Sequence, residues 1–217
     1  KSSTAEFSAT LDWALRLAVI VTVPAAVGLV ILAGPILITL FQYDAFQLDD
    51  VRMSMYSLVA YSAGLPAFIV VKVLAPGYYA RQDTKTPVKI AITAMVTNML
   101  LNLIFVGLLL QYGFEGPHAG LALASSAAAY LNAILLYRGL RKREVYKPER
   151  GWWRLWLAII LACTAMGALL FFMTHDLESW HQAAAGLRVK NLTLSISFGV
   201  LVYVFTCMVT GLKTHDL

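Results

Sequence analysis

Charged residues are scarce in this sequence, and their scarcity excludes a soluble globular domain. Asp, Glu, Lys and Arg make up 13% of the 217 residues, whereas soluble domains carry roughly a quarter. The mean hydropathy is +0.71. Apolar runs of about 18 or more residues recur, long enough to cross a bilayer as helices, and the short alternating segments of a transmembrane barrel are missing. The sequence therefore predicts an all-α, polytopic membrane protein.

The sequence also lacks the motifs of common enzymes. It has no Gly-rich phosphate loop, no serine nucleophile elbow and no paired carboxylates within an apolar run. Its two cysteines, Cys163 and Cys207, lie inside apolar runs, which is typical of small hydrophobic side chains rather than redox or metal sites. Its four histidines show no ligand spacing. We therefore expect no catalytic residue, no metal site and no cofactor.

A signal peptide is missing as well. The opening residues, KSSTAEFSATLDWALRL, contain no initiator Met, no basic segment followed by an apolar one, and no cleavage site. This polar start is typical of a membrane interface. We expect the chain to be a piece of a longer protein.

Six apolar runs predict six membrane-spanning helices. They lie at about 11–41, 54–75, 88–110, 118–138, 153–174 and 190–211. The first is long and contains Pro24 and the pair Gly34-Pro35, so we expect it to be kinked. Neighbouring helices must then satisfy the carbonyls that proline leaves free, because lipid cannot.

Lys and Arg residues predict the orientation of these spans. If both ends of the chain face the cytoplasm, only Arg52, Arg188 and Lys190 of the 17 cations lie on the opposite side. The net charge of +5 is then explained by cytoplasmic loops beside anionic lipid, and we expect no nucleic-acid partner.

The helix predicted at 118–138 is rich in small residues. Gly120, Ala124 and Ala128 follow one another at intervals of four and would let another helix approach closely. We expect this helix inside the bundle. The last two spans, at 153–174 and 190–211, are nearly all apolar, and we expect them to face lipid.

The stretch 71–89 is predicted to form a cytoplasmic turn between the second and third spans. We expect Pro76-Gly77 to end the second span and Thr86-Pro87 to cap the third. Lys72 lies just inside the end of the second span. It either extends its ammonium group to the interface or lines a cavity that receives an anionic substrate.

Two amides form the other polar candidate within the membrane. Asn98 and Asn102 share one helical face of the third span, four residues apart. They either form interhelical hydrogen bonds, for example to Ser125 or Ser126, or supply neutral oxygen ligands to a cation such as Na⁺.

Several stretches together resemble a known bacterial family. They are LFQYDAF (40–46), VVKVLAPGYYARQDTKTPVKIA (70–91), NLIFVG (102–107) and GLALASSAAAYLNAILLYRGLRK (120–142). They resemble the C-terminal half of the MurJ (MviN) family of lipid II flippases, in the multidrug/oligosaccharidyl-lipid/polysaccharide exporter superfamily. The resemblance extends over nearly all of the chain and is most specific at 72–89.

This resemblance implies a fourteen-helix transporter of two lobes in the bacterial inner membrane, of which the chain supplies six helices, most of the C-terminal lobe. Its partners would be lipid II, membrane lipids and the missing N-terminal lobe. The family moves lipid II to the periplasmic leaflet by alternating access, and coupling to Na⁺ or to the membrane potential are the two candidate energy sources. The spans at 153–174 and 190–211 correspond to a groove for the polyprenyl tail.

The resemblance also ranks the candidate site residues. Lys72, Arg81 and Lys85 are the cations that could contact the anionic pyrophosphate of the substrate. Asn98 and Asn102 are neutral where some members of the family bind a cation with a carboxylate. Two alternatives stay open: another polysaccharide-lipid or multidrug exporter of the superfamily, and a non-transporting membrane scaffold for cell-wall machinery.

Overall fold

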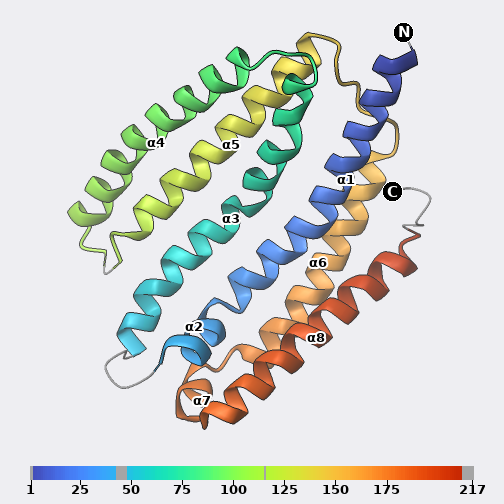
Figure 1. Ribbon diagram of the computed structural model, residues 1–217. Helices are drawn as coiled ribbons and strands as arrows, with labels where there is room; N and C mark the ends of the chain where they lie inside the picture. Colours follow the sequence, from blue (N-terminus) through green and yellow to red (C-terminus); the bar gives the residue numbers. More distant parts are fainter. Residues whose placement is uncertain (1, 43–47, 115, 212–217) are drawn as a thin grey trace.

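A computed structural model describes residues 2–42, 48–114 and 116–211 (Figure 1). The described residues form eight α-helices and no strand. The helices are α1 (Ser2–Ile31), α2 (Ala33–Phe41), α3 (Leu48–Tyr79), α4 (Lys85–Gln111), α5 (Ala119–Lys142), α6 (Trp152–Thr174), α7 (Leu177–Gln182) and α8 (Ala185–Val209). Six of them, all except α2 and α7, are long and apolar enough to span a membrane.

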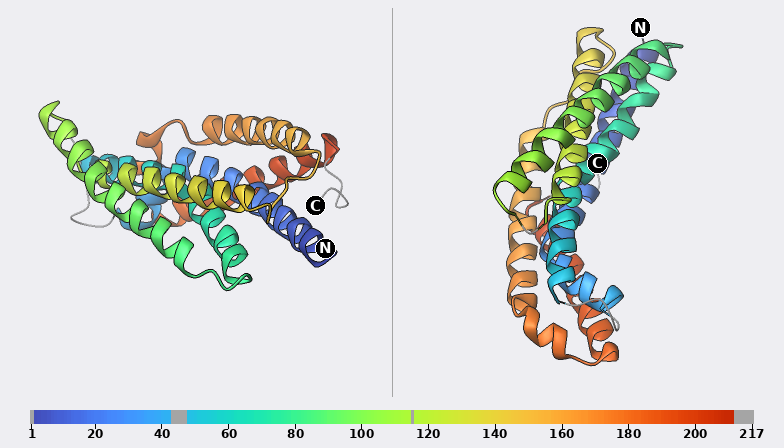
Figure 2. Two further views of the ribbon diagram at one scale, coloured as in Figure 1. Left: turned by 90° about the horizontal axis from the view of Figure 1, so that it is seen from above. Right: turned by 90° about the vertical axis from the view of Figure 1, so that its left-hand side faces the viewer.

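The helices form two groups joined by α1. In one group α5 packs between α3 and α4, which barely contact each other; in the other, α6 packs against α8. Helix α1 contacts both α3 and α6, and Figures 1 and 2 show it between the two groups. Helix α1 begins and α8 ends at one end of the bundle, where the α3–α4 turn and the α5–α6 loop also lie (Figure 1).

Close contacts hold α5 at the centre of its group, as its small residues predict. The hydroxyl of Ser126 donates a hydrogen bond of 2.7 Å to the carbonyl of Ala60 on α3, beside Gly64. A Cβ added at Gly64 would lie 2.3 Å from the Ser126 Oγ, so this approach requires glycine. Gly120 lies close to the backbone of α4, where an added Cβ would be 3.0 Å from the nitrogen of Val106.

The predicted span at 11–41 is not one continuous helix. Helix α1 ends at Ile31, the chain turns at Leu32, and α2 runs from Ala33 to Phe41. Pro35 explains the interruption, since it has no N–H to donate to the carbonyl of Ile31. The helix is therefore interrupted at Leu32, just before Gly34-Pro35, and only the part up to Ile31 is long enough to span the membrane.

The prediction that Pro76-Gly77 ends the second span is wrong. Helix α3 continues to Tyr79, and the chain turns at 80–82, where Gln82 has a φ of +58°. A proline bends a helix without ending it when packing holds the following turn, and Gly77 and Tyr78 are both buried. Lys72 is consequently seven residues, or about 10 Å, from the end of its helix.

The predicted cap at Thr86-Pro87 is also wrong, because Asp83 fills that role. The carboxylate of Asp83 accepts a hydrogen bond of 3.0 Å from the backbone N–H of Thr86 in the first turn of α4. It also pairs with Arg143 at the end of α5. The hydrogen bonds from Thr86, followed by the interaction with Arg143, lower the pKa of Asp83 to about 2. The carboxylate is thus ionised at neutral pH and joins the α3–α4 turn to α5.

The last two spans were both expected to face lipid; the exposure of α8 agrees with this expectation, whereas that of α6 does not. In α6, 44% of the membrane-spanning window is buried, against 17% in α8 and only 6% in α4. Helix α6 is therefore a packed helix, because α1 and α8 cover two of its sides. The most exposed span is α4, whose free side is lined with Met and Leu side chains.

Candidate functional site

An apolar groove of about 510 Å³ lies between α1, α6 and α8. Helices α1 and α8 each pack on α6 but make few contacts with each other, so a cleft is left between them. Its lining is almost wholly apolar and includes Pro24 and Gly28 on α1, Met166 and Leu170 on α6, and Gly199 on α8. Such a surface favours a hydrocarbon chain.

Glycine keeps part of this groove open. A Cβ added at Gly28 would meet no atom within 4 Å, so the space above it is unfilled. Gly199 differs, because a Cβ there would lie 3.1 Å from the side chain of Leu170. Gly28 thus widens the groove, and Gly199 lets α8 approach α6.

One hydrogen bond crosses the groove and depends on a proline. Pro24 has no N–H for the carbonyl of Ile20, four residues earlier, so that carbonyl is free in α1. The hydroxyl of Tyr203 on α8 donates to it at 2.8 Å. The expectation that a neighbouring helix satisfies a carbonyl freed by proline is confirmed at this position.

A buried polar network lies on the predicted cytoplasmic side of the groove and is centred on Asp12, which is 1% exposed. Its carboxylate accepts hydrogen bonds from the Tyr146 hydroxyl at 2.6 Å, the Trp152 Nε1 at 2.8 Å and the Arg16 Nε at 2.7 Å. The backbone N–H of Glu149 donates at 3.3 Å. These donors compensate for the cost of burying the charge.

This network fixes the loop between α5 and α6 against α1. Arg16 donates to the carbonyl of Arg150 at 3.0 Å, and its guanidinium lies 5.6 Å from the ring centroid of Trp152. Burial, reinforced by the neighbouring Asp12 carboxylate, raises the pKa of Tyr146 far above its usual range. Tyr146 therefore stays protonated and keeps donating to Asp12.

Sequence reasoning did not select Asp12, although the sequence contains a signal. Asp12 is a single carboxylate in an apolar stretch, with a cation four residues later at Arg16, a spacing that brings two helical side chains together. A charge so placed requires partners. Three of them, Tyr146, Glu149 and Trp152, are more than 130 residues away, and only the fold identifies them.

The predicted substrate cations lie apart from the groove. Lys72 is exposed on α3, Arg81 is exposed in the turn after α3, and Lys85 is exposed at the start of α4. All three belong to the α3–α4–α5 group and none lines the groove. Their contact with substrate stays a prediction.

The predicted pair Asn98 and Asn102 is half-buried on α4. Their Oδ1 atoms are buried and accept no hydrogen bond from the described residues. Ser125 donates instead to Leu121 in its own helix at 2.9 Å, and Ser126 donates to α3. The expected hydrogen bonds from the amides to these serines are therefore not formed.

The comparisons with known proteins agree on one family. The family model described as "Lipid II flippase MurJ" matches residues 1–188. The chain belongs to the MurJ family. A probable lipid II flippase MurJ of Haemophilus influenzae is 42% identical, over 99% of this chain and 41% of its own length. The corresponding Vibrio cholerae protein is 40% identical over 97% of this chain and 39% of its own.

A solved structure shows the same fold. The lipid II flippase MurJ in an inward closed conformation matches 94% of this chain and 39% of its own, with a TM-score of 0.71 and 27% sequence identity. The chain thus spans about two fifths of the length of the MurJ proteins it matches. The resemblance to MurJ and the all-helical fold are confirmed, and membership places the chain in the inner membrane as a multi-pass protein.

Proposed function

We propose that this chain is part of the C-terminal lobe of a flippase that moves lipid II from the cytoplasmic to the periplasmic leaflet by alternating access. The match to the MurJ family over residues 1–188 carries the proposal. The apolar groove supports it, because a polyprenyl-linked substrate has a long hydrocarbon tail that needs an apolar path. The rest of the transporter, including the N-terminal lobe, would come from the remaining sequence of the full-length protein.

The decisive experiment measures where lipid II accumulates. Depleting the full-length protein from cells should raise lipid II in the cytoplasmic leaflet and lower its labelling by a probe that reaches only the periplasmic leaflet. An unchanged leaflet distribution would reject the flippase and favour a membrane scaffold. If depletion instead changes the leaflet distribution of another lipid-linked glycan and leaves that of lipid II unchanged, a different exporter of the superfamily is favoured.

Filling the groove should impair transport without unfolding the protein. In Gly28→Leu, the new side chain enters the open space of the groove, and leucine has a better helix propensity than glycine. We expect transport in the leaflet assay to fall several-fold, with an unfolding temperature no lower than that of the parent.

Gly107 offers a matched control for this experiment. It also lies inside a long helix with no atom within 4 Å of an added Cβ, but it is on α4, away from the groove. Gly107→Leu should transport like the parent. Equal transport by both variants would show that the groove does not hold the tail.

The energy source stays a proposal. The buried and unpartnered oxygens of Asn98 and Asn102 support a weak cation site on α4, with Na⁺ as the candidate ion. The membrane potential is the other candidate, because it acts on charges that move across the bilayer. Running the leaflet assay with Na⁺ replaced by choline, and separately with the potential collapsed, distinguishes the two.

A further inference from the structure

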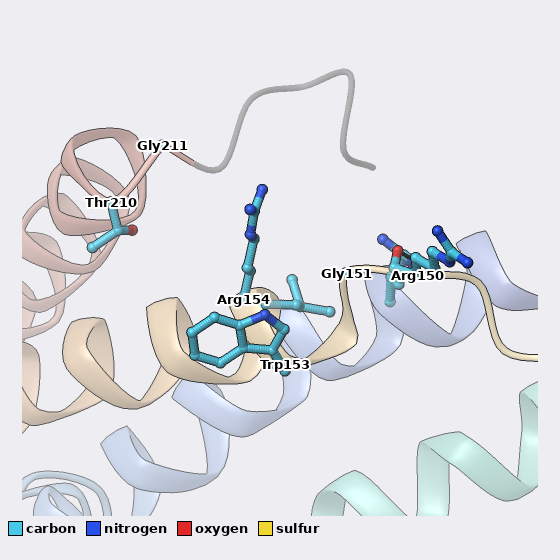
Figure 3. A pocket seen from close by; sticks show the side chains of 8 residues that line it. Arg150, Gly151, Trp153, Arg154, Thr210 and Gly211 are labelled. Carbon is cyan, nitrogen blue, oxygen red and sulfur yellow. Dashed lines mark hydrogen bonds between the residues drawn. The ribbon is translucent and has the colours of Figure 1, made fainter.

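A second pocket, of about 710 Å³, lies beyond the groove at the end of the bundle where α1 begins (Figure 3). It is formed by the end of the α5–α6 loop, the start of α6, the end of α8 and Arg16 of α1. Figure 3 shows Trp153 and Arg154 on α6 facing Thr210 and Gly211 at the end of α8, with Arg150 on the side of α1. Among the residues that the structure describes, its lining contains three arginines, Arg16, Arg150 and Arg154, and no carboxylate.

The charge of this pocket comes from Arg150 and Arg154. The charge of Arg16 is balanced by Asp12, 2.7 Å from its Nε. Arg150 and Arg154 are exposed, and neither forms an ion pair with a described residue. The Asp12 network nevertheless positions one of them, since Arg16 holds the carbonyl of Arg150. Two positive charges are thus presented on an ordered backbone.

The start of α6 adds a favourable backbone dipole. Gly151 precedes the helix with a φ of +107°, no described side chain caps the first turn, and that turn contains no acidic residue. The uncapped end of a 23-residue helix presents N–H groups and a partial positive charge to the same space as the arginines. The site therefore favours an anion more strongly than the two side chains alone would.

The position of the pocket indicates the source of that anion. Trp153, which is 68% exposed, lines it, and indole side chains of this kind mark the headgroup level of a bilayer. The pocket also shares α1, α6 and α8 with the groove, and Arg16 is only five residues, or about 7 Å of helix, from Val21 in the groove lining. If the phosphate of a lipid lay in the pocket, the acyl chains of the same lipid would lie against the apolar surface of the groove.

We propose that this pocket binds the phosphate head group of an anionic glycerophospholipid, such as phosphatidylglycerol, from the cytoplasmic leaflet. Basic pockets between membrane helices on the cytoplasmic side are suited to this chemistry. The bound lipid would cover the cytoplasmic mouth of the groove between α1 and α8. This inference does not depend on transport and would hold for a protein of the same fold with another substrate.

The test measures phospholipid binding to the full-length protein in detergent by native mass spectrometry. In Arg150→Gln/Arg154→Gln, the affinity for phosphatidylglycerol should fall at least about tenfold, because both cations that would contact the phosphate are removed. Arg150→Lys/Arg154→Lys should recover most of that affinity. Binding of zwitterionic phosphatidylethanolamine should be the same in every variant.

Lys142→Gln/Lys147→Gln is the matched control. It removes the same charge from the same end of the bundle, but both residues lie outside the pocket, and the affinity for phosphatidylglycerol should stay within about twofold of the parent. Equal losses in the pocket and control variants would overturn the proposal. Farnesyl diphosphate is the second probe. If the pocket variant binds farnesyl diphosphate more weakly but binds phosphatidylglycerol like the parent, the pocket binds a prenyl diphosphate and the phospholipid assignment fails.

Discussion

Replacing Asp12 by alanine is expected to lower the free energy of unfolding by about 3–5 kcal/mol, the usual cost of removing one member of a buried ion pair. The effect is large because the carboxylate is 1% exposed and Arg16 is 9% exposed. Without Asp12, the guanidinium stays buried without its counter-charge, and the hydroxyl of Tyr146 and the indole N–H of Trp152 lose their acceptor. Denaturation of the full-length protein in mixed micelles measures the change.

Asp49 supplies the control for this substitution. It also pairs with an arginine a short distance along a helix, but its side chain is 82% exposed and its distance to Arg52 is 3.8 Å. An exposed pair contributes at most about 1 kcal/mol, so Asp49→Ala should have little effect. If the two variants were equally stable, the Asp12 network would not be what holds the α5–α6 loop on α1.

The second large effect is expected at Gly139 on α5, where alanine should cost about 2–3 kcal/mol of unfolding free energy. An added Cβ would lie 2.1 Å from the hydroxyl of Tyr78, a side chain that is 1% exposed and belongs to a packed apolar cluster. Relieving that overlap would also break the 2.8 Å hydrogen bond from Tyr78 to the carbonyl of Leu136. The same denaturation experiment measures the loss.

A double-mutant cycle separates this overlap from other effects. In Tyr78→Phe/Gly139→Ala the hydroxyl is gone and the nearest ring carbon is 3.3 Å away, so the double variant should be more stable than Gly139→Ala alone. Gly107→Ala, at an open position, should instead be neutral or stabilising by up to about 1 kcal/mol. A double variant as unstable as the single one would show that α5 tolerates no side chain at Gly139 for some other reason.

The sequence predicts local properties of this fold well. Apolar length identifies six membrane-spanning helices, and the spacing of Gly120, Ala124 and Ala128 predicts the buried position of α5. Element ends are less predictable, because they depend on packing from distant residues. Pro76 was expected to end α3, but the buried Gly77 and Tyr78 hold the helix to Tyr79.

The candidate sites show the same limit. Lys72 and Asn98 attract attention because polar groups are rare in apolar runs, but the groove contains no polar signal and exists only because α1 and α8 both pack on α6. The cationic pocket likewise joins Arg16 to residues more than 130 positions later. Sequence spacing reveals neighbours on one helix, whereas both cavities are made by several helices that meet only in the fold.

The bond from Tyr203 to Ile20 has a consequence for how these positions can evolve. With alanine at position 24, the carbonyl of Ile20 would regain its helical N–H partner, and the bond from Tyr203 would no longer be needed to satisfy it. Losing the tyrosine first would instead leave a bare carbonyl facing hydrocarbon. The tyrosine can therefore be lost at low cost only where position 24 is not proline, so relatives with proline at 24 are expected to keep a hydrogen-bond donor at 203. An alignment in which proline at 24 often occurs without a donor at 203 would contradict this coupling.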